Sequence, residues 1–128
     1  MSKELEDRFQ NYARSVRDYC TKIKWDVINK GYSKQVIRLS GSISANYTEA
    51  SDDLGKADQK KKIRISRREE KEAIKWLDLT LTYEDKLLKQ IKTKLIDDGY
   101  QIRKNIIRSN YKARRIKFKI RTVKLSVP

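Results

Sequence analysis

The chain has 128 residues, which is enough for one compact domain and too few for two of ordinary size. Its 32 lysines and arginines against 17 acidic residues give a formal net charge of +15, which favours a polyanionic partner such as nucleic acid. The absence of histidine, the single cysteine (Cys20) and the lack of any run of about 18 apolar residues argue against histidine-dependent catalysis, an internal disulfide and a membrane span.

The first predicted helix covers about residues 4–24. Apolar residues recur there every three or four positions, from Leu5 to Ile23, which is the period of one helix face. Turn and cap chemistry then follows before the next apolar stripe, at Asn29, Gly31 and Ser33.

A second helix is predicted over about residues 32–54. Its apolar stripe resumes at Val36 and continues to Leu54. Gly55 is expected to end the helix, because glycine accepts the left-handed conformation common at helix C-termini.

Within this helix the run RLSGSISANYTEAS, residues 38–51, is rich in small side chains. It does not match a phosphate-binding loop, because Asn46 stands where the second glycine is required after Gly41. It does not match a nucleophile turn either, since Ile43 would occupy the nucleophile position. A flexible linker would not keep Ile43 in register with the apolar stripe. The run therefore predicts a helix with a small-residue face, used for close packing within the bundle or for a subunit contact beside Gly41 and Ala45.

Two more helices are predicted in the second half, over about 58–81 and 83–109. Thr82 and Asp85 have the spacing of a capping box at the start of the fourth helix. Gly99 lies inside that helix, where glycine costs about 1 kcal/mol relative to alanine. Because the apolar stripe keeps its phase across Gly99, we expect a kink or a close contact there rather than a helix end.

Four amphipathic helices with short connections predict an all-α fold, an up-down-up-down four-helix bundle over residues 1–109. Residues 110–128 form a basic tail with seven lysines and arginines and no acid. Around Phe118 the tail alternates apolar and charged residues, which is a strand period, yet a lone strand has nothing to pair with in a helical bundle. The tail is expected to be disordered when free or to form a strand with a partner.

The run QVIRLSGSISANYTEASDDLGK, followed by RISRREEKEAIKWLDL, resembles a bacterial four-helix-bundle family. That family comprises proteins encoded in 23S rRNA intervening sequences and the accessory proteins of diversity-generating retroelements. The resemblance covers most of residues 4–109 and implies a ring-shaped homopentamer, with a reverse transcriptase as partner in the retroelement branch. The chain departs from the family pattern at several positions: Ser44 replaces a glycine, Glu70 replaces a small apolar residue, and the basic tail has no counterpart.

Three overlapping groups of candidate site residues follow. The residues expected to pack helices or subunits together are Arg38, Ser40, Gly41, Ser44, Ala45, Asn46 and Glu49. Within the family-like motifs, polar residues of the second and third helices are expected either to form a buried network or to stand as exposed pairs: Arg38, Asn46, Glu49, Arg67, Glu69 and Glu72. The residues expected to bind nucleic acid are Lys60, Lys61, Lys62, Arg64, Arg67 and Arg68 on the bundle and Lys112, Arg114, Arg115, Lys117, Lys119, Arg121 and Lys124 in the tail.

The favoured function is a non-catalytic nucleic-acid-binding subunit for RNA or an RNA–DNA intermediate, working as a homopentameric accessory protein of a retroelement reverse transcriptase. The alternative is an intervening-sequence protein that acts as an oligomeric scaffold without a nucleic-acid function. No residue constellation indicates an enzyme, a cofactor or a metal centre. The N-terminal MSKELEDRFQ has no apolar signal-peptide core, so a cytoplasmic protein is expected.

Overall fold

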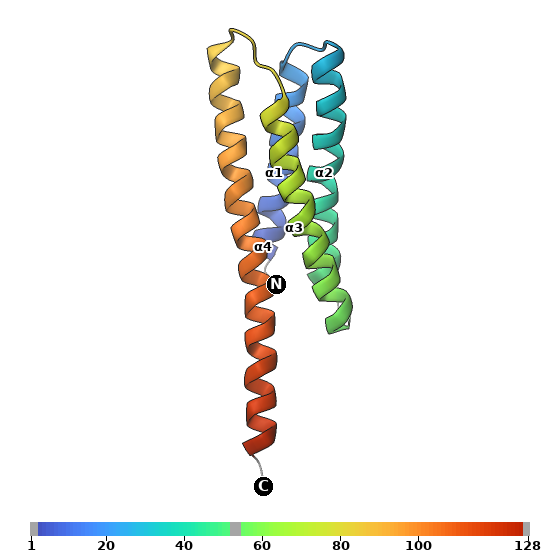
Figure 1. The fold of residues 1–128 in the computed structure, drawn as a ribbon, viewed down its shortest axis with the longest axis vertical. Helices are drawn as coiled ribbons and strands as arrows, with labels where there is room; N and C mark the ends of the chain where they lie inside the picture. Colours follow the sequence, from blue (N-terminus) through green and yellow to red (C-terminus); the bar gives the residue numbers. More distant parts are fainter. Residues whose placement is uncertain (1–2, 52–54, 127–128) are drawn as a thin grey trace.

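Four antiparallel helices pack in the order of the chain, each against its sequence neighbours, and the first also packs against the last (Figure 1). This computed structural model describes residues 3–51 and 55–126, and side chains for residues 3–50 and 55–109. The predicted all-α up-down-up-down bundle is confirmed. The helices are α1 (Lys3–Lys22), α2 (Val27–Ser51), α3 (Lys56–Leu79) and α4 (Lys86–Ser126).

The core lies where the predicted apolar stripes of the four helices meet. Phe9 of α1 and Tyr47 of α2 are fully buried and pack edge to face, with ring centroids 4.6 Å apart. Ile63 and Leu77 of α3 and Ile102 of α4 complete this core. Because each helix buries only one stripe, none of the four is stable alone, and the bundle is the unit that folds. The predicted stripe residue Leu54 lies outside the described residues.

The second helix begins earlier than predicted, because Asp26 caps it. The Asn29 backbone N–H donates to Asp26 Oδ1 at 2.9 Å, so α2 starts at Val27 and Gly31 lies within the helix. The predicted turn at residues 29–33 is therefore wrong, and the connection is residues 23–26. Asn29 is instead fully buried and bonds the other connection, with its amide donating to Leu81 O at 2.9 Å and accepting from Leu81 N at 2.8 Å.

Two further boundary predictions are corrected by local hydrogen bonds. The Leu88 backbone N–H donates to Asp85 Oδ1 at 3.0 Å, so Asp85 caps α4 directly, and Thr82 closes a turn before it through its carbonyl. Gly55 has φ −55° and stands at the N-cap of α3, so it is not the left-handed end of α2.

Gly99 makes the predicted close helix contact. A Cβ at this position would lie 2.9 Å from Glu70 Oε1 and from Ile74 Cγ1 of α3, and 3.1 Å from the Tyr12 hydroxyl of α1. Glycine thus allows three helices to converge around one buried carboxyl.

The last helix is longer than predicted. α4 continues to Ser126 and extends past the other three helices, so residues 110–126 of the region expected to be a disordered or strand-forming tail have a helical backbone in the isolated chain (Figure 1). Helix elongation needs no new nucleus, and no glycine or proline interrupts residues 100–127, so the existing helix propagates through a short alternating pattern. A strand formed with a partner stays a prediction.

Candidate nucleic-acid interface

Five basic side chains form a line along the outer face of α3. Their spacing of three or four residues places them within about 80° of one another around the helix and over about 21 Å of its length. All five are exposed. We call this line the α3 basic stripe; it consists of Lys61, Arg64, Arg68, Lys71 and Lys75.

The charges of this stripe are not paired with carboxylates in the part of the chain whose side chains the structure describes. Among the described side chains, none of the five takes part in an ion pair or a hydrogen bond. By contrast, Lys62, one position along the helix, pairs with Glu49 of α2 at 2.6 Å. Exposed cations in a row, with no carboxylate bonded to them, are the arrangement that phosphate groups of a nucleic-acid backbone neutralise.

The predicted basic residues of α3 fall into an exposed group and a half-buried group, according to their position around the helix axis. Lys61, Arg64 and Arg68 lie in the stripe, whereas Lys60, Lys62 and Arg67 are half-buried, and Lys60 and Lys62 already have polar partners. Sequence reasoning missed Lys71 and Lys75, although their spacing continues the stripe by one and two turns. The side chains of the seven predicted tail cations lie outside the described residues, and their backbone belongs to α4.

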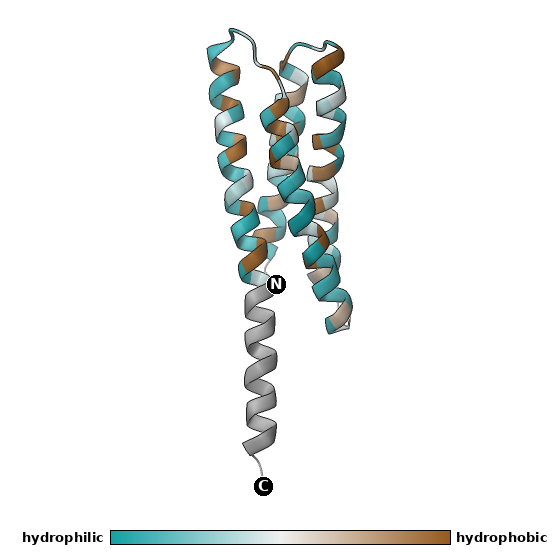
Figure 2. Cartoon of the chain, viewed as in Figure 1, coloured by the Kyte–Doolittle hydropathy of each residue, from teal (hydrophilic) through white to brown (hydrophobic). Residues whose placement is uncertain are grey.

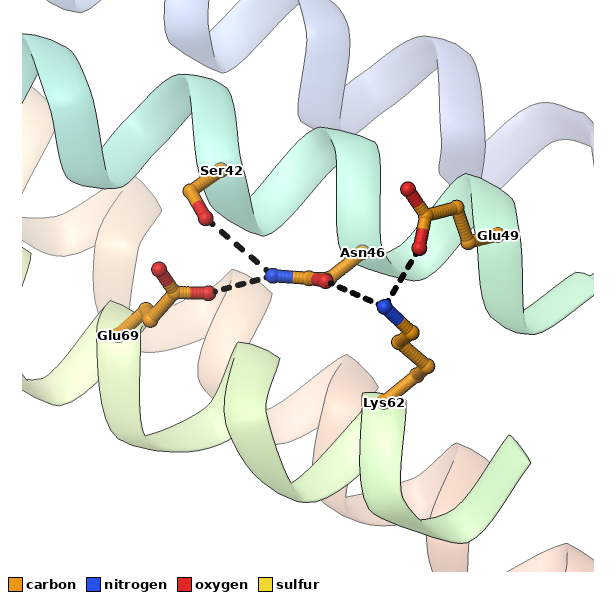
Figure 3. Close-up of polar contacts among 5 residues, drawn as sticks. All are labelled: Ser42, Asn46, Glu49, Lys62 and Glu69. Carbon is orange, nitrogen blue, oxygen red and sulfur yellow. Dashed lines mark hydrogen bonds and ion pairs between the residues drawn. The ribbon is translucent and has the colours of Figure 1, made fainter. Parts of the chain in front are cut away.

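Polar residues of α2 and α3 form the predicted network in part (Figure 3). Asn46 donates from Nδ2 to Glu69 Oε1 at 2.8 Å and to Ser42 Oγ at 3.2 Å. Its Oδ1 accepts from Lys62 Nζ at 3.5 Å, and the same ammonium reaches Glu49. The network therefore bridges the two helices. It also holds the Lys62 ammonium against α2, where it is less available to bind a phosphate group.

The other residues assigned to that network lie elsewhere. Arg38 is exposed and donates to Gln35 of its own helix, at 3.2 Å, so it matches the exposed pairs that were the other expectation rather than the network. Glu72 is exposed on α3 and Arg67 is half-buried, and neither bonds to Asn46 or Glu69. The network thus joins Ser42 and Lys62, which the motif did not single out, to Asn46, Glu49 and Glu69.

The small residues of α2 divide between two faces. Ser40 and Ser44 are buried, and Ser44 Oγ donates to Gln10 Oε1 of α1 at 2.8 Å, so these two serve packing within the bundle as predicted. Gly41 and Ala45 are exposed, and a Cβ at Gly41 would meet nothing within 4 Å. Close packing within the chain is therefore the wrong explanation for Gly41, and a subunit contact on this side stays a prediction.

Sequence reasoning missed the buried acid Glu70. The side chain is fully buried between α1 and α4, and neither carboxyl oxygen has a hydrogen-bond partner among the described groups. Burial raises the pKa of Glu70 to about 8, and the nearby Tyr12 hydroxyl offsets part of that rise. Burial also raises the pKa of Tyr12, with the Glu70 charge as the next cause. The signal was present, because Glu70 falls on the buried stripe, four residues after Ser66.

Neither metal binding nor membrane insertion has support in the described part of the chain. No group of three or more cysteine, aspartate or glutamate side chains there is arranged to hold a metal ion. Among the same residues, no helix combines the length and apolarity that a bilayer crossing requires.

One solved structure closely matches this architecture. It is a protein with unknown function from the S23 ribosomal protein family of Bacteroides thetaiotaomicron VPI-5482, with a TM-score of 0.67 and 28% sequence identity over 83% of this chain and 97% of that one. No protein-family model matches the sequence, and no curated protein matches it. The chain is thus similar, in fold and in sequence, to a protein of the S23 ribosomal protein family.

Proposed function

We propose that this chain is a non-catalytic subunit that binds the phosphate backbone of RNA or of an RNA–DNA intermediate. The observation that carries the proposal is the α3 basic stripe: five exposed cations in one line, none bonded to a described carboxylate. The net charge of +15 supports the same ligand class, because it draws polyanions to the whole molecule.

The geometry of the stripe suits backbone binding without base selection. Successive cations stand one helical turn apart, about 5 Å along the axis, which is comparable with the spacing of phosphates along a strand. No aromatic side chain belongs to the stripe, and Trp76 of the same helix packs against Tyr32 of α2 instead, with ring centroids 5.7 Å apart. Affinity should therefore come from released counterions and depend strongly on salt.

We extend the proposal to the oligomeric state of the chain and to its protein partner. The motif resemblance favours a homopentamer that accompanies a reverse transcriptase, and the exposed Gly41 and Ala45 of α2 offer a face on which another copy can approach closely. Under the alternative, the chain is an oligomeric scaffold whose basicity has no nucleic-acid target.

Neutralising part of the stripe tests the function. The variant Lys61→Gln/Arg64→Gln/Arg68→Gln should weaken binding of a single-stranded RNA and lower the slope of log affinity against log salt by about 2, since each phosphate left without its cation removes about 0.7. The matched control removes the same charge from three different helices, as Arg8→Gln/Lys34→Gln/Lys94→Gln, and should change the slope less.

Two outcomes would count against the proposal. Equal losses of affinity in the stripe variant and the control would show that net charge, not the stripe, sets the affinity. If the unmodified chain shows no RNA or RNA–DNA binding even at low salt, the nucleic-acid function is wrong and the scaffold alternative stands.

A further inference from the structure

Exposed apolar side chains gather at one end of the bundle. This connection end consists of residues 22–30 and 78–87, which hold the α1–α2 and α3–α4 connections and the adjoining helix ends. Seven of the ten large apolar side chains exposed in the described structure lie here, with Val27 at 85%, Leu87 at 65% and Trp25 at 55% exposure. In Figure 2 the apolar colouring marks the ends of α2 and α3 beside these connections. A concentration of this kind marks an interaction surface.

Hydrogen bonds hold the two connections to each other, so the backbone that carries the exposed apolar side chains is ordered. The fully buried Asn29 amide bonds both the N–H and the carbonyl of Leu81. Tyr83 donates to Asp26 across the end, and the Lys24 ammonium lies over the Tyr83 ring at 5.4 Å. From α4, Lys92 donates to Thr80 O at 2.8 Å. A surface that is already ordered loses little conformational entropy when it binds.

The charges of the connection end are balanced and separated into halves. The α1–α2 half, residues 22–30, carries three lysines and one aspartate, a net of +2. The α3–α4 half, residues 78–87, carries two aspartates, one glutamate and one lysine, a net of −2. The whole excess of +15 therefore lies elsewhere on the chain, and this end does not attract a polyanion.

We propose that the connection end binds the connection end of a second copy, in a two-fold contact. A two-fold axis along the boundary between the halves places the positive half of one copy over the negative half of the other, while the apolar side chains meet in between. The same operation keeps the strongly basic remainder of each bundle at the far ends, where mutual repulsion is weakest. The contact forms without nucleic acid. It doubles the number of chains in any assembly that the protein forms through its other surfaces.

Two charge-reversal variants test this contact, because each should lose the association and a mixture of the two should restore it. Lys22→Glu/Lys30→Glu turns the positive half to −2, and Asp78→Lys/Glu84→Lys turns the negative half to +2. Each variant alone then presents two like-charged halves and should stay at half the mass of the unmodified chain in sedimentation at matched concentration. An equimolar mixture of the two should restore the doubled mass. Arg8→Glu/Lys34→Glu, with the same change in net charge elsewhere, should associate like the unmodified chain.

The apolar part is tested separately by Val27→Asp. Val27 is the first residue of α2 and is exposed, and an acid in the first turn suits the helix dipole, so the fold should keep its helicity while association weakens at least tenfold. Association should also shift the fluorescence of Trp25 to shorter wavelength. A mass for the unmodified chain that does not double with concentration, or a mixture that fails to associate, would overturn the proposal. Loss of RNA binding in the α3 stripe variants would leave the doubling unchanged.

Discussion

At the scale of single residues, Glu70 is the position where the bundle departs most from a simple apolar core. Its carboxyl is enclosed by Tyr12 of α1 and by the backbone of α4 at Gly99. Asp98 of α4 also acts on Tyr12 and raises its pKa, so a second acidic residue adds to the negative charge around this site. Neither Glu70 carboxyl oxygen makes a well-aligned hydrogen bond among the described groups, and the nearby Tyr12 hydroxyl offsets only part of the cost of burial, so the protonated form is the one this site favours.

Replacing Glu70 by glutamine should remove a pH dependence of stability. The folded pKa of about 8 lies above the unfolded value of 4.5, so the stability linked to this group is full below pH 4.5 and is lost as pH rises through 8. Between about pH 5 and pH 8 the free energy of unfolding should fall by up to about 1.4 kcal/mol per pH unit in the unmodified chain. Urea unfolding at several pH values should show a flatter profile for Glu70→Gln, and the exposed Glu72→Gln should keep the original slope. Parallel profiles for Glu70→Gln and the unmodified chain would contradict this account.

Gly99→Ala should destabilise the bundle even though alanine is the better helix former. The added carbon would sit 2.9 Å from atoms of Glu70 and Ile74, and overpacking of this kind costs about 1–3 kcal/mol against about 1 kcal/mol of helix propensity. Gly31→Ala is the matched control, because nothing lies within 4 Å of its Cβ position, and it should be neutral or stabilising. If the close contact is real, thermal unfolding should show a lower melting temperature for Gly99→Ala and an equal or higher one for Gly31→Ala than for the unmodified chain. Equal shifts in melting temperature for the two variants would refute the contact.

At the scale of helices, periodicity in the sequence was enough to predict four helices and the residues that they bury. The starts of α2 and α4 were missed because a single side chain decides each of them: Asp26 and Asp85 accept the first free backbone N–H groups, although other cap residues stand nearby. The α3 cations were predicted from composition, but which of them face solvent depends on helix phase and on Asn46, which draws Lys62 inward. Glu70 was missed as a buried acid because charged residues are ordinarily exposed, although its position four residues after Ser66 places it on the buried stripe.

Deleting residues 110–128 should weaken RNA binding and flatten its salt dependence. The segment contains seven basic residues and no acid, and its helical backbone continues α4 beyond the bundle. Each phosphate that the segment no longer neutralises should lower the salt slope by about 0.7 for single-stranded RNA. A full-length variant with those seven residues changed to glutamine separates the effect of charge from that of length, and affinities at two salt concentrations are the measurement. If both variants bind RNA as the intact chain does, the segment belongs to a protein partner instead.

At the scale of the whole molecule, the surface separates into regions of different chemistry. The α3 stripe is basic and has no ion pair among the described side chains, the connection end is apolar and balanced in charge, and the outer side of α2 exposes Gly41 and Ala45. Under the two proposals, a single subunit contacts nucleic acid through the stripe and other copies through the connection end and the outer side of α2. Such division is what an assembly of repeated subunits around a polyanion requires, since each contact can form without covering another.

The side-by-side contact of subunits is tested by Gly41→Leu. Within one chain this change should leave stability nearly untouched, because no atom lies within 4 Å of the added Cβ and the site is exposed. In an assembly, the leucine side chain would stand between helices of two copies that approach closely at this small residue. The mass of the assembly should then fall towards that of smaller species. The starting mass is five times the 15.2 kDa of one chain, or ten times with end-to-end pairing. Gly31→Leu, at another open helical glycine of α2, should keep the full mass. Sedimentation separates the outcomes, with circular dichroism confirming that both variants remain helical. An unchanged mass for Gly41→Leu would remove α2 from the subunit interface and, with it, the reason for the small residues at positions 41 and 45.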